Sequence, residues 1–192
     1  GGYLNPFVGL PEASTAILLI LLLSLLVLWG IKETVRANVV LTAVEVAGLI
    51  LVVILGARYL GSVNYFEAPS GLGGIVSAAA LIFFAFIGFE SLTKLGEETK
   101  NPERTIPRAL ISALTISTML FVLVALAVVS IVPYRQLALS SSPLADVALT
   151  AQGPQFSLLL SMIALVATAN TVLIIFTSTS RIAYGMAKES SL

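Results

Sequence analysis

The chain has 192 residues, of which 58% are hydrophobic and only 10% are charged, and its mean hydropathy is +1.04. Ordinary soluble domains carry about 25% charged residues, so this composition excludes a soluble globular domain and indicates an integral membrane protein. Ten cationic and ten acidic side chains cancel, and the sequence has no Cys and no His, so nucleic acid, disulfides, thiolate chemistry and the commonest metal sites are not expected.

Five apolar windows are long enough to cross a hydrocarbon core of roughly 30 Å, which takes about 20 residues of helix. The chain starts at Gly1 without the basic segment of a signal peptide, and we interpret it as an excerpt whose parent chain has further helices at both ends. The sequence predicts an all-α integral membrane protein, with residues 1–192 forming one partial transmembrane domain. The expected spans run over about 13–31, 35–60, 72–95, 106–132 and 155–184.

The first two windows are separated by a short polar turn, Lys32 to Arg36, so we expect two antiparallel neighbouring helices. In the second window, Glu45 lies nine residues beyond Arg36, about 13 Å along a helix and near the middle of the membrane. An ionised side chain there costs at least a few kcal/mol, so Glu45 should face protein or a wet cavity. It is either a functional carboxylate or a hydrogen-bonding link to a neighbouring helix.

The third window contains the run Phe83-Phe84-Ala85-Phe86-Ile87-Gly88-Phe89-Glu90. Glycine has low helix propensity and is free to leave helical dihedral angles, so the run predicts a helix broken near Ile87-Gly88. Carbonyls freed by a break attract a cation such as an ammonium group, and the phenylalanine rings offer apolar walls. The alternative is that these aromatic residues only pack against a neighbouring helix.

Glu90 stands four residues before Lys94, near the end of the third window. At this spacing on a helix the two side chains can form an ion pair at the membrane interface. The other interpretation is a gating or proton-responsive carboxylate just inside the cytoplasmic mouth. The sequence leaves both interpretations open.

Residues 133–154, between the fourth and fifth windows, contain a short predicted helix with Ser142 as its cap and Pro143 in its first turn. We expect it outside the membrane, as an interfacial spacer or a lid. The fifth window is unusually polar in its second half. Its side chains either supply oxygen ligands to Na⁺ or bond to their own helix and pack against neighbours. They are Thr168, Asn170, Thr171, Thr177, Ser178, Thr179 and Ser180.

The cationic side chains indicate the orientation of the chain. In the five-span arrangement eight of the ten fall on one side, and only Arg58 and Arg135 fall on the other. The positive-inside rule then places the Lys32 turn, the Lys94–Arg108 loop and the C-terminus in the cytoplasm.

Beyond these patterns, the chain resembles amino acid permeases of the amino acid–polyamine–organocation superfamily. The run from Phe83 to Glu90 resembles their sixth helix. The cytoplasmic loop that follows that helix in the family is similar to Gly96-Glu97-Glu98-Thr99-Lys100-Asn101-Pro102-Glu103-Arg104-Thr105-Ile106-Pro107-Arg108-Ala109.

Two further stretches agree in order and spacing, so the resemblance covers nearly the whole chain. Gly30-Ile31-Lys32-Glu33, followed by Asn38 and Glu45, resembles the link from the fourth to the fifth helix. The end of the family's eighth helix is similar to Ser180-Arg181 together with Tyr184-Gly185-Met186-Ala187-Lys188-Glu189.

The resemblance implies a five-plus-five inverted-repeat transporter fold, of which this chain would cover about the fourth to eighth helices. It also implies that the α-amino group of an amino acid meets backbone carbonyls around Phe84 and Ile87. The expected substrate segment is Phe84, Ala85, Phe86, Ile87 and Gly88, and the carboxylate half of the site would lie in helices outside this chain. Glu45 falls close to a position at which some relatives carry a charge linked to proton coupling, although others carry a basic residue there.

We therefore expect secondary active transport of amino acids across the cytoplasmic membrane by alternating access, with proton coupling favoured. The expected partners are an amino acid, a proton or Na⁺, the lipid bilayer and the missing helices, without a cofactor. An exchanger, a Na⁺-coupled symporter and a non-transporting scaffold or sensor are the alternatives; an enzyme is not expected, since the usual catalytic residues are missing. The candidate coupling or gating residues are Glu45, Glu90, Asn170, Thr171, Thr177 and Ser178.

Overall fold

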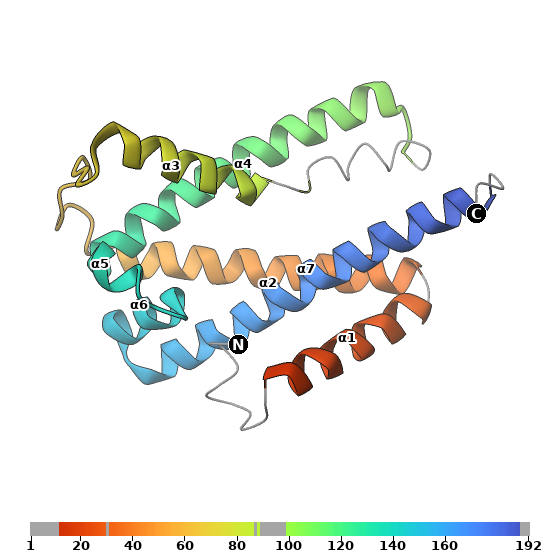
Figure 1. Ribbon diagram of the computed structural model, residues 1–192, viewed down its shortest axis with the longest axis horizontal. Helices are drawn as coiled ribbons and strands as arrows, with labels where there is room; N and C mark the ends of the chain where they lie inside the picture. Colours follow the sequence, from red (N-terminus) through yellow and green to blue (C-terminus); the bar gives the residue numbers. More distant parts are fainter. Residues whose placement is uncertain (1–11, 30, 87, 89–98, 189–192) are drawn as a thin grey trace.

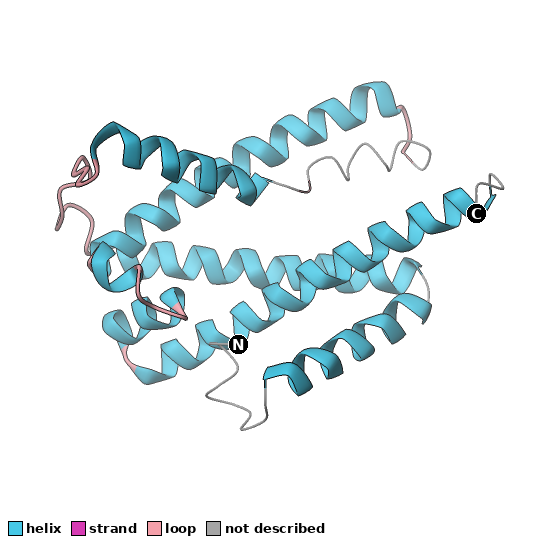
Figure 2. Ribbon diagram, viewed as in Figure 1, coloured by secondary structure: helices cyan, strands magenta, loops and turns pink. Residues whose placement is uncertain are grey.

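The computed structural model describes residues 12–29, 31–86, 88 and 99–188, and every regular element within them is helical (Figure 2). The prediction of an all-α protein is confirmed. The helices, in chain order, are α1 (Glu12–Trp29), α2 (Ile31–Ala57), α3 (Gly71–Phe83), the short 3₁₀ helix η1 (Phe84–Phe86), α4 (Pro102–Ile131), α5 (Tyr134–Leu137), α6 (Pro143–Gln152) and α7 (Pro154–Lys188).

Five of these helices lie at the five apolar windows. Among the described residues, α2, α4 and α7 contain stretches that are long and apolar enough to cross a membrane. The apolar stretches of the other two helices are shorter, Ala16–Leu28 in α1 and Gly71–Phe86 through α3 and η1. The last part of the third window, from residue 89, lies outside the described residues.

The predicted polar turn from Lys32 to Arg36 is wrong, because these residues form the first turns of α2. Two local effects favour the helix. Glu33 stands in its first turn, where a carboxylate interacts favourably with the helix dipole. Thr34 is only 2% exposed, and its hydroxyl donates to the carbonyl of Leu26 in α1 at 3.4 Å. Helix α1 therefore ends at Trp29, α2 begins at Ile31, and the two helices are in contact.

Helix α2 is the central element of the arrangement. It contacts α1, α4, α6 and α7, while α7 also contacts α1 and α6. The end of α2, the end of α4 and the start of α7 lie together with α5 and α6 at one end of the molecule (Figure 1). The start of α2, the start of α4 and the end of α7 lie at the other end.

The hydrophobic core is centred where α2, α4, α6 and α7 meet. Helix α6 contributes Val147 and Ala148, both fully buried, and Val52 of α2 is fully buried as well. The sequence predicts the short helix in residues 133–154 as an interfacial spacer or a lid, whereas α6 contributes buried side chains to the core. The small side chains at three- and four-residue spacing make this packing close.

The predicted start of α6 is confirmed, with Ser142 at the cap position and Pro143 in the first turn. The Ser142 side chain makes no capping hydrogen bond. Ser140 provides the side-chain hydrogen bonds at this helix start instead. Its hydroxyl accepts a hydrogen bond from the Ser142 backbone N–H at 3.0 Å and donates to the carboxylate of Asp146.

Candidate functional site

Three polar residues of α2 lie on one face of the helix. Asn38, Thr42 and Glu45 follow one another at spacings of four and three residues, which places them one above the other along the helix. This face is turned toward α7, and Asn170 of α7 is only 3% exposed there. The fold thus brings Glu45 and Asn170, both predicted site residues, into contact.

The Asn170 carboxamide bonds to all three side chains. Its Oδ1 accepts a hydrogen bond from Asn38 Nδ2 at 2.9 Å. Its Nδ2 donates to Thr42 Oγ1 at 3.0 Å and to Glu45 Oε2 at 3.1 Å. We call these four side chains the Asn170 network. A single buried amide therefore uses its acceptor and both donor hydrogens to join α7 to two turns of α2.

The network lies in apolar surroundings. Glu45 is the one charged residue in α2 after Arg36, and α7 has no charged residue between Pro154 and Ser180. Burying an ionisable group among such neighbours is costly unless it is hydrogen-bonded. The half-buried Glu45 carboxylate finds its donor in Asn170.

The other predicted coupling residues of α7 lie elsewhere. The Thr171 hydroxyl donates to the Ala167 carbonyl at 3.0 Å, and the Thr177 hydroxyl donates to the Leu173 carbonyl at 2.7 Å. Both bonds are within α7, as in the helix-bonding alternative. Ser178 is half-buried and stands eight residues beyond Asn170, about 12 Å along the helix.

The regular helix of the third window ends just before the predicted break at Ile87-Gly88, and the chain from residue 89 lies outside the described residues. The α-helix ends at Phe83 and tightens into η1 at Phe84–Phe86, and Gly88 has φ +115°, a dihedral angle that is unfavourable for any other residue. Two further predicted residues, Ile87 and Glu90, lie outside the described residues.

The end of this helix contacts α4. The Phe86 ring meets the Phe121 ring edge to face, with centroids 5.8 Å apart and an angle of 69° between the rings. Phe84 is 69% exposed, so its ring is largely free of the described helices. The ring contact places η1 beside the middle of α4.

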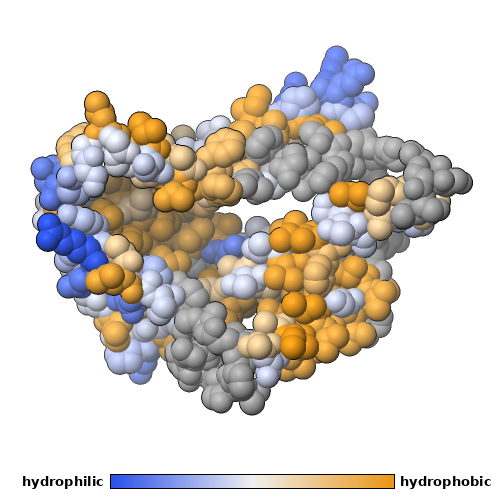
Figure 3. All heavy atoms as spheres, viewed as in Figure 1, coloured by the Kyte–Doolittle hydropathy of each residue, from blue (hydrophilic) through white to orange (hydrophobic). Residues whose placement is uncertain are grey.

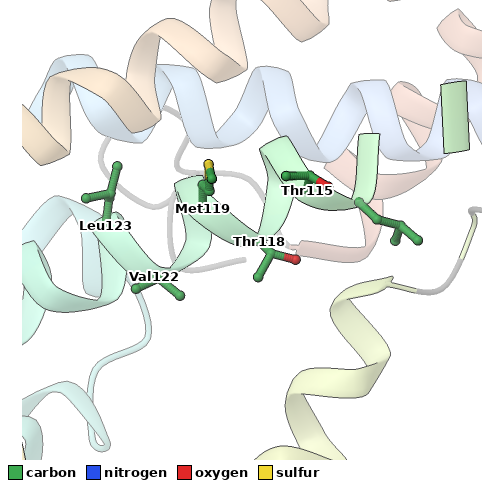
Figure 4. A pocket seen from close by; sticks show the side chains of 6 residues that line it. Thr115, Thr118, Met119, Val122 and Leu123 are labelled. Carbon is green, nitrogen blue, oxygen red and sulfur yellow. The ribbon is translucent and has the colours of Figure 1, made fainter. Parts of the chain in front are cut away.

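An open pocket of about 700 Å³ runs along α4, whose residues alone, among those that the structure describes, line it (Figure 4). Its lining is mainly apolar, with two hydroxyl groups. The residues are Leu114, Thr115, Thr118, Met119, Val122 and Leu123. Sequence reasoning missed this surface, because α4 carries no charge or glycine pattern in that part to mark it.

Sequence reasoning also assigned no role in the site to Asn38 or Thr42. A signal for both was present, since their spacing from Glu45 marks a polar face in a helix that is otherwise apolar. The partner on α7 could be proposed only as one of several polar residues of the fifth window.

The cationic residues divide between the two ends of the molecule. Arg36, Arg104, Arg108 and Arg181 belong to the end formed by the start of α2, the start of α4 and the last turns of α7 (Figure 1). Arg58 and Arg135 belong to the opposite end, where α2 terminates and α5 lies.

The family model that matches this chain and a relative that covers most of it both point to amino acid permeases. The family model for amino acid permeases matches residues 2–192. The branched-chain amino acid permease BcaP of Bacillus subtilis is 29% identical over 175 residues, which cover 91% of this chain and 38% of that protein.

Two further relatives match shorter stretches. The methylthioribose transporter of Bacillus subtilis is 36% identical over 64% of this chain and 27% of its own length. The vacuolar cationic amino acid transporter 4 of Arabidopsis thaliana is 36% identical over 69% of this chain and 23% of its own length. The chain thus spans between 23% and 38% of the length of these three relatives.

Proposed function

Because this chain belongs to the amino acid permease family, a family of multi-pass membrane transporters and not of enzymes, we propose that its parent protein moves amino acids across a membrane. Transport proceeds by alternating access, with the broken third helix as part of the substrate site. The energy comes from an ion gradient, and the proton is the favoured ion.

The amino-group half of the substrate site is the segment Phe84 to Gly88. A helix that ends inside the membrane leaves carbonyls without partners in their own helix, and such carbonyls attract an ammonium group. The ring contact between Phe86 and Phe121 supports a site in which η1 lies beside α4. The apolar pocket on α4 offers space for an aliphatic side chain, as in the branched-chain substrates that the name of the BcaP relative states.

One observation carries the coupling proposal: the Glu45 carboxylate, in an apolar stretch of α2, takes its hydrogen bond from the buried amide of Asn170. Both donor hydrogens of Asn170 point at oxygens, those of Thr42 and Glu45. A Na⁺ ion needs those oxygens as ligands and gains nothing from N–H groups. The network therefore favours a proton that binds and leaves Glu45.

The cationic ends support the orientation of the parent protein in a cytoplasmic membrane. The Lys32 segment, the Lys94–Arg108 loop and the C-terminal end of α7 face the cytoplasm, since Lys and Arg are enriched on that side. The end that carries Arg58, Arg135 and α6 faces outward.

The test is uptake by the complete parent protein in proteoliposomes, with a panel that includes leucine and lysine. Glu45→Gln should abolish accumulation driven by a pH gradient and preserve counterflow, which needs no gradient. Thr171→Val is the control on α7, because that hydroxyl bonds only within its own helix in the described contacts, and it should keep both activities.

Three results would decide against parts of the proposal. Intact pH-driven accumulation in Glu45→Gln would remove the coupling role of Glu45. Accumulation that follows a Na⁺ gradient alone would establish the Na⁺-coupled alternative. Substrate-dependent thermal stabilisation without counterflow would establish a non-transporting sensor.

A further inference from the structure

We propose that Asn38 is a positioning residue for Glu45 and acts through Asn170. Its side-chain N–H holds the oxygen end of the Asn170 carboxamide away from the carboxylate, so that the nitrogen end stays toward Glu45. This inference rests on the proposed coupling role of Glu45 for its functional meaning, whereas the positioning itself can be tested without transport.

An asparagine carboxamide has two ends of nearly the same shape but opposite chemistry. One end is an acceptor oxygen, and the other is an NH₂ group with two donor hydrogens. Shape alone therefore does not decide whether Asn170 turns nitrogen or oxygen toward Glu45. The neighbours of the amide have to make that choice.

The ionised Glu45 carboxylate can only accept, so it selects the nitrogen end of Asn170, and a hydrogen bond from Asn38 holds the amide in that orientation. The Asn38 carboxamide presents its own NH₂ end to Asn170. Its Nδ2 donates to Asn170 Oδ1 at 2.9 Å, which holds the oxygen end on the side away from Glu45. Thr42 contributes no preference, since a hydroxyl group donates or accepts as needed. With Asn38 in place, Asn170 Nδ2 lies 3.1 Å from Glu45 Oε2.

The opposite arrangement is unfavourable for a carboxylate. If Asn38 presented its oxygen, Asn170 would turn its nitrogen toward Asn38 and its own oxygen toward Glu45 Oε2. Two acceptor oxygens would then face each other at about the distance of a hydrogen bond, between the buried Asn170 and the half-buried Glu45, which is unfavourable. While Glu45 accepts a hydrogen bond, only one orientation of the Asn170 amide pairs every donor in the network with an acceptor.

Asn38 and Glu45 are seven residues apart on α2, about 10 Å along the helix, and in the described contacts it is Asn170 that joins them. This separation gives a sharp test by reversal. Asn38→Asp keeps the shape but, as a carboxylate, offers only acceptors. Asn170 must then turn its nitrogen to residue 38 and its oxygen to Glu45.

Adding Glu45→Gln restores a consistent network, because a glutamine at position 45 donates its amide hydrogen to the reversed Asn170 oxygen. The measurement is the melting temperature of the purified parent protein. Asn38→Asp should lower it by about 2–4 °C, and Asn38→Asp with Glu45→Gln should return it to within about 1 °C of the Glu45→Gln single variant. In an Asn170→Leu background the two changes should become additive.

Additive effects with Asn170 present would overturn the inference, as would rescue that persists in the Asn170→Leu background. If Asn38→Asp does not reach the membrane in folded form, Asn38→Leu gives a second measurement. It removes the donor at nearly equal volume, and pH-driven accumulation should fall about fivefold while counterflow stays within about twofold. Unchanged pH-driven accumulation in Asn38→Leu would also overturn it.

The two proposals fail separately. Rescue of the melting temperature, combined with full pH-driven accumulation in Glu45→Gln, would keep Asn38 as a positioning residue and remove the coupling role of Glu45. If the two substitutions change the melting temperature additively and Glu45→Gln loses pH-driven accumulation, Glu45 keeps its coupling role and Asn38 is not a positioning residue.

Discussion

Gly56 lies where α2 approaches α4 so closely that a side chain has no space. A Cβ atom at this position would be 2.3 Å from the Cβ of Ala127 and 2.7 Å from its Cα. At Gly48 the nearest atom is Ile163 Cγ2 of α7, at 2.5 Å, which belongs to a side chain and not to the backbone. Small residues at such contacts let membrane helices pack backbone against backbone, so these two glycines set how α2 meets α4 and α7.

Gly56→Ala should destabilise the parent protein by about 1–3 kcal/mol, because the α4 backbone has to move away. Melting in detergent solution, followed by tryptophan fluorescence or light scattering, measures this. Gly73→Ala is the matched control: Gly73 is helical, has nothing within 4 Å of a built Cβ, and should gain stability slightly from the better helix propensity of alanine. Equal melting temperatures for Gly56→Ala and the unchanged protein would contradict the close contact.

Arg58, just beyond the end of α2, attaches α6 to that helix. The Arg58 guanidinium donates to the Ala151 carbonyl in the last turn of α6 and to the Tyr59 hydroxyl at 2.9 Å, and it lies over the Tyr59 ring at 4.8 Å from the centroid. A cation at the C-terminal end of a helix satisfies free carbonyls and interacts favourably with the dipole. Arg58 therefore adds to the apolar contacts that hold α6.

Arg58→Ala should loosen the last turn of α6 by up to about 1 kcal/mol. Hydrogen exchange by mass spectrometry of the peptide covering residues 143–152 should become about fivefold faster. Arg135→Ala is the control, since the described contacts of Arg135 are with its neighbour Tyr134. Equal exchange in both variants would show that the apolar packing alone holds α6.

The loop between α2 and α3 is tied to α4 in a similar way. The Ser62 hydroxyl donates to the Ser130 carbonyl at 2.9 Å, and the Tyr65 and Ser130 hydroxyl groups are 2.7 Å apart. Both bonds lie at the end of the molecule that holds α6. The contacts of Arg58, Ser62 and Tyr65 thus join α2, α4 and α6 into one unit at that end.

The whole molecule exposes apolar side chains along its helices. Leu28 is 80% exposed and Leu72 is 81% exposed, far beyond what a water-soluble surface carries in continuous patches. In the view of Figure 3, polar side chains gather toward the ends of the helices, and apolar side chains cover much of the surface between them. This distribution matches a bilayer, whose hydrocarbon core accepts the apolar surface while the polar ends reach water.

The parent protein should therefore stay in the membrane pellet after washing with alkaline carbonate and dissolve only in detergent. The physical reason is that exposed leucines of this kind lose favourable burial when the bilayer is removed. A peripheral membrane protein of the same cells serves as the control that the wash releases. Release of the parent protein by carbonate would contradict an integral membrane location.

The all-α class, the positions of the helices, the end of the third helix before Gly88 and the start of α6 could be predicted from the sequence. Each depends on a local property: the length of an apolar run, the dihedral freedom of a glycine, or the fit of Pro143 to a first helical turn. The same reasoning predicted that Glu45 faces protein or a wet cavity, because a charge in an apolar helix is costly where it meets lipid. The predicted turn at the start of α2 was wrong, because the polarity of its residues does not reveal that Thr34 is buried against α1.

Only the tertiary structure decided which partner Glu45 has and where α6 belongs. Asn170 is 125 residues away from Glu45, and its place opposite Asn38, Thr42 and Glu45 depends on how α2 and α7 fit together at contacts such as Gly48 with Ile163. Likewise, the burial of Val147 depends on the space left between α2, α4 and α7. Such fits are set by the shapes of several helices at once, whereas the sequence determines by itself only what each helix is and which side chains cannot face lipid.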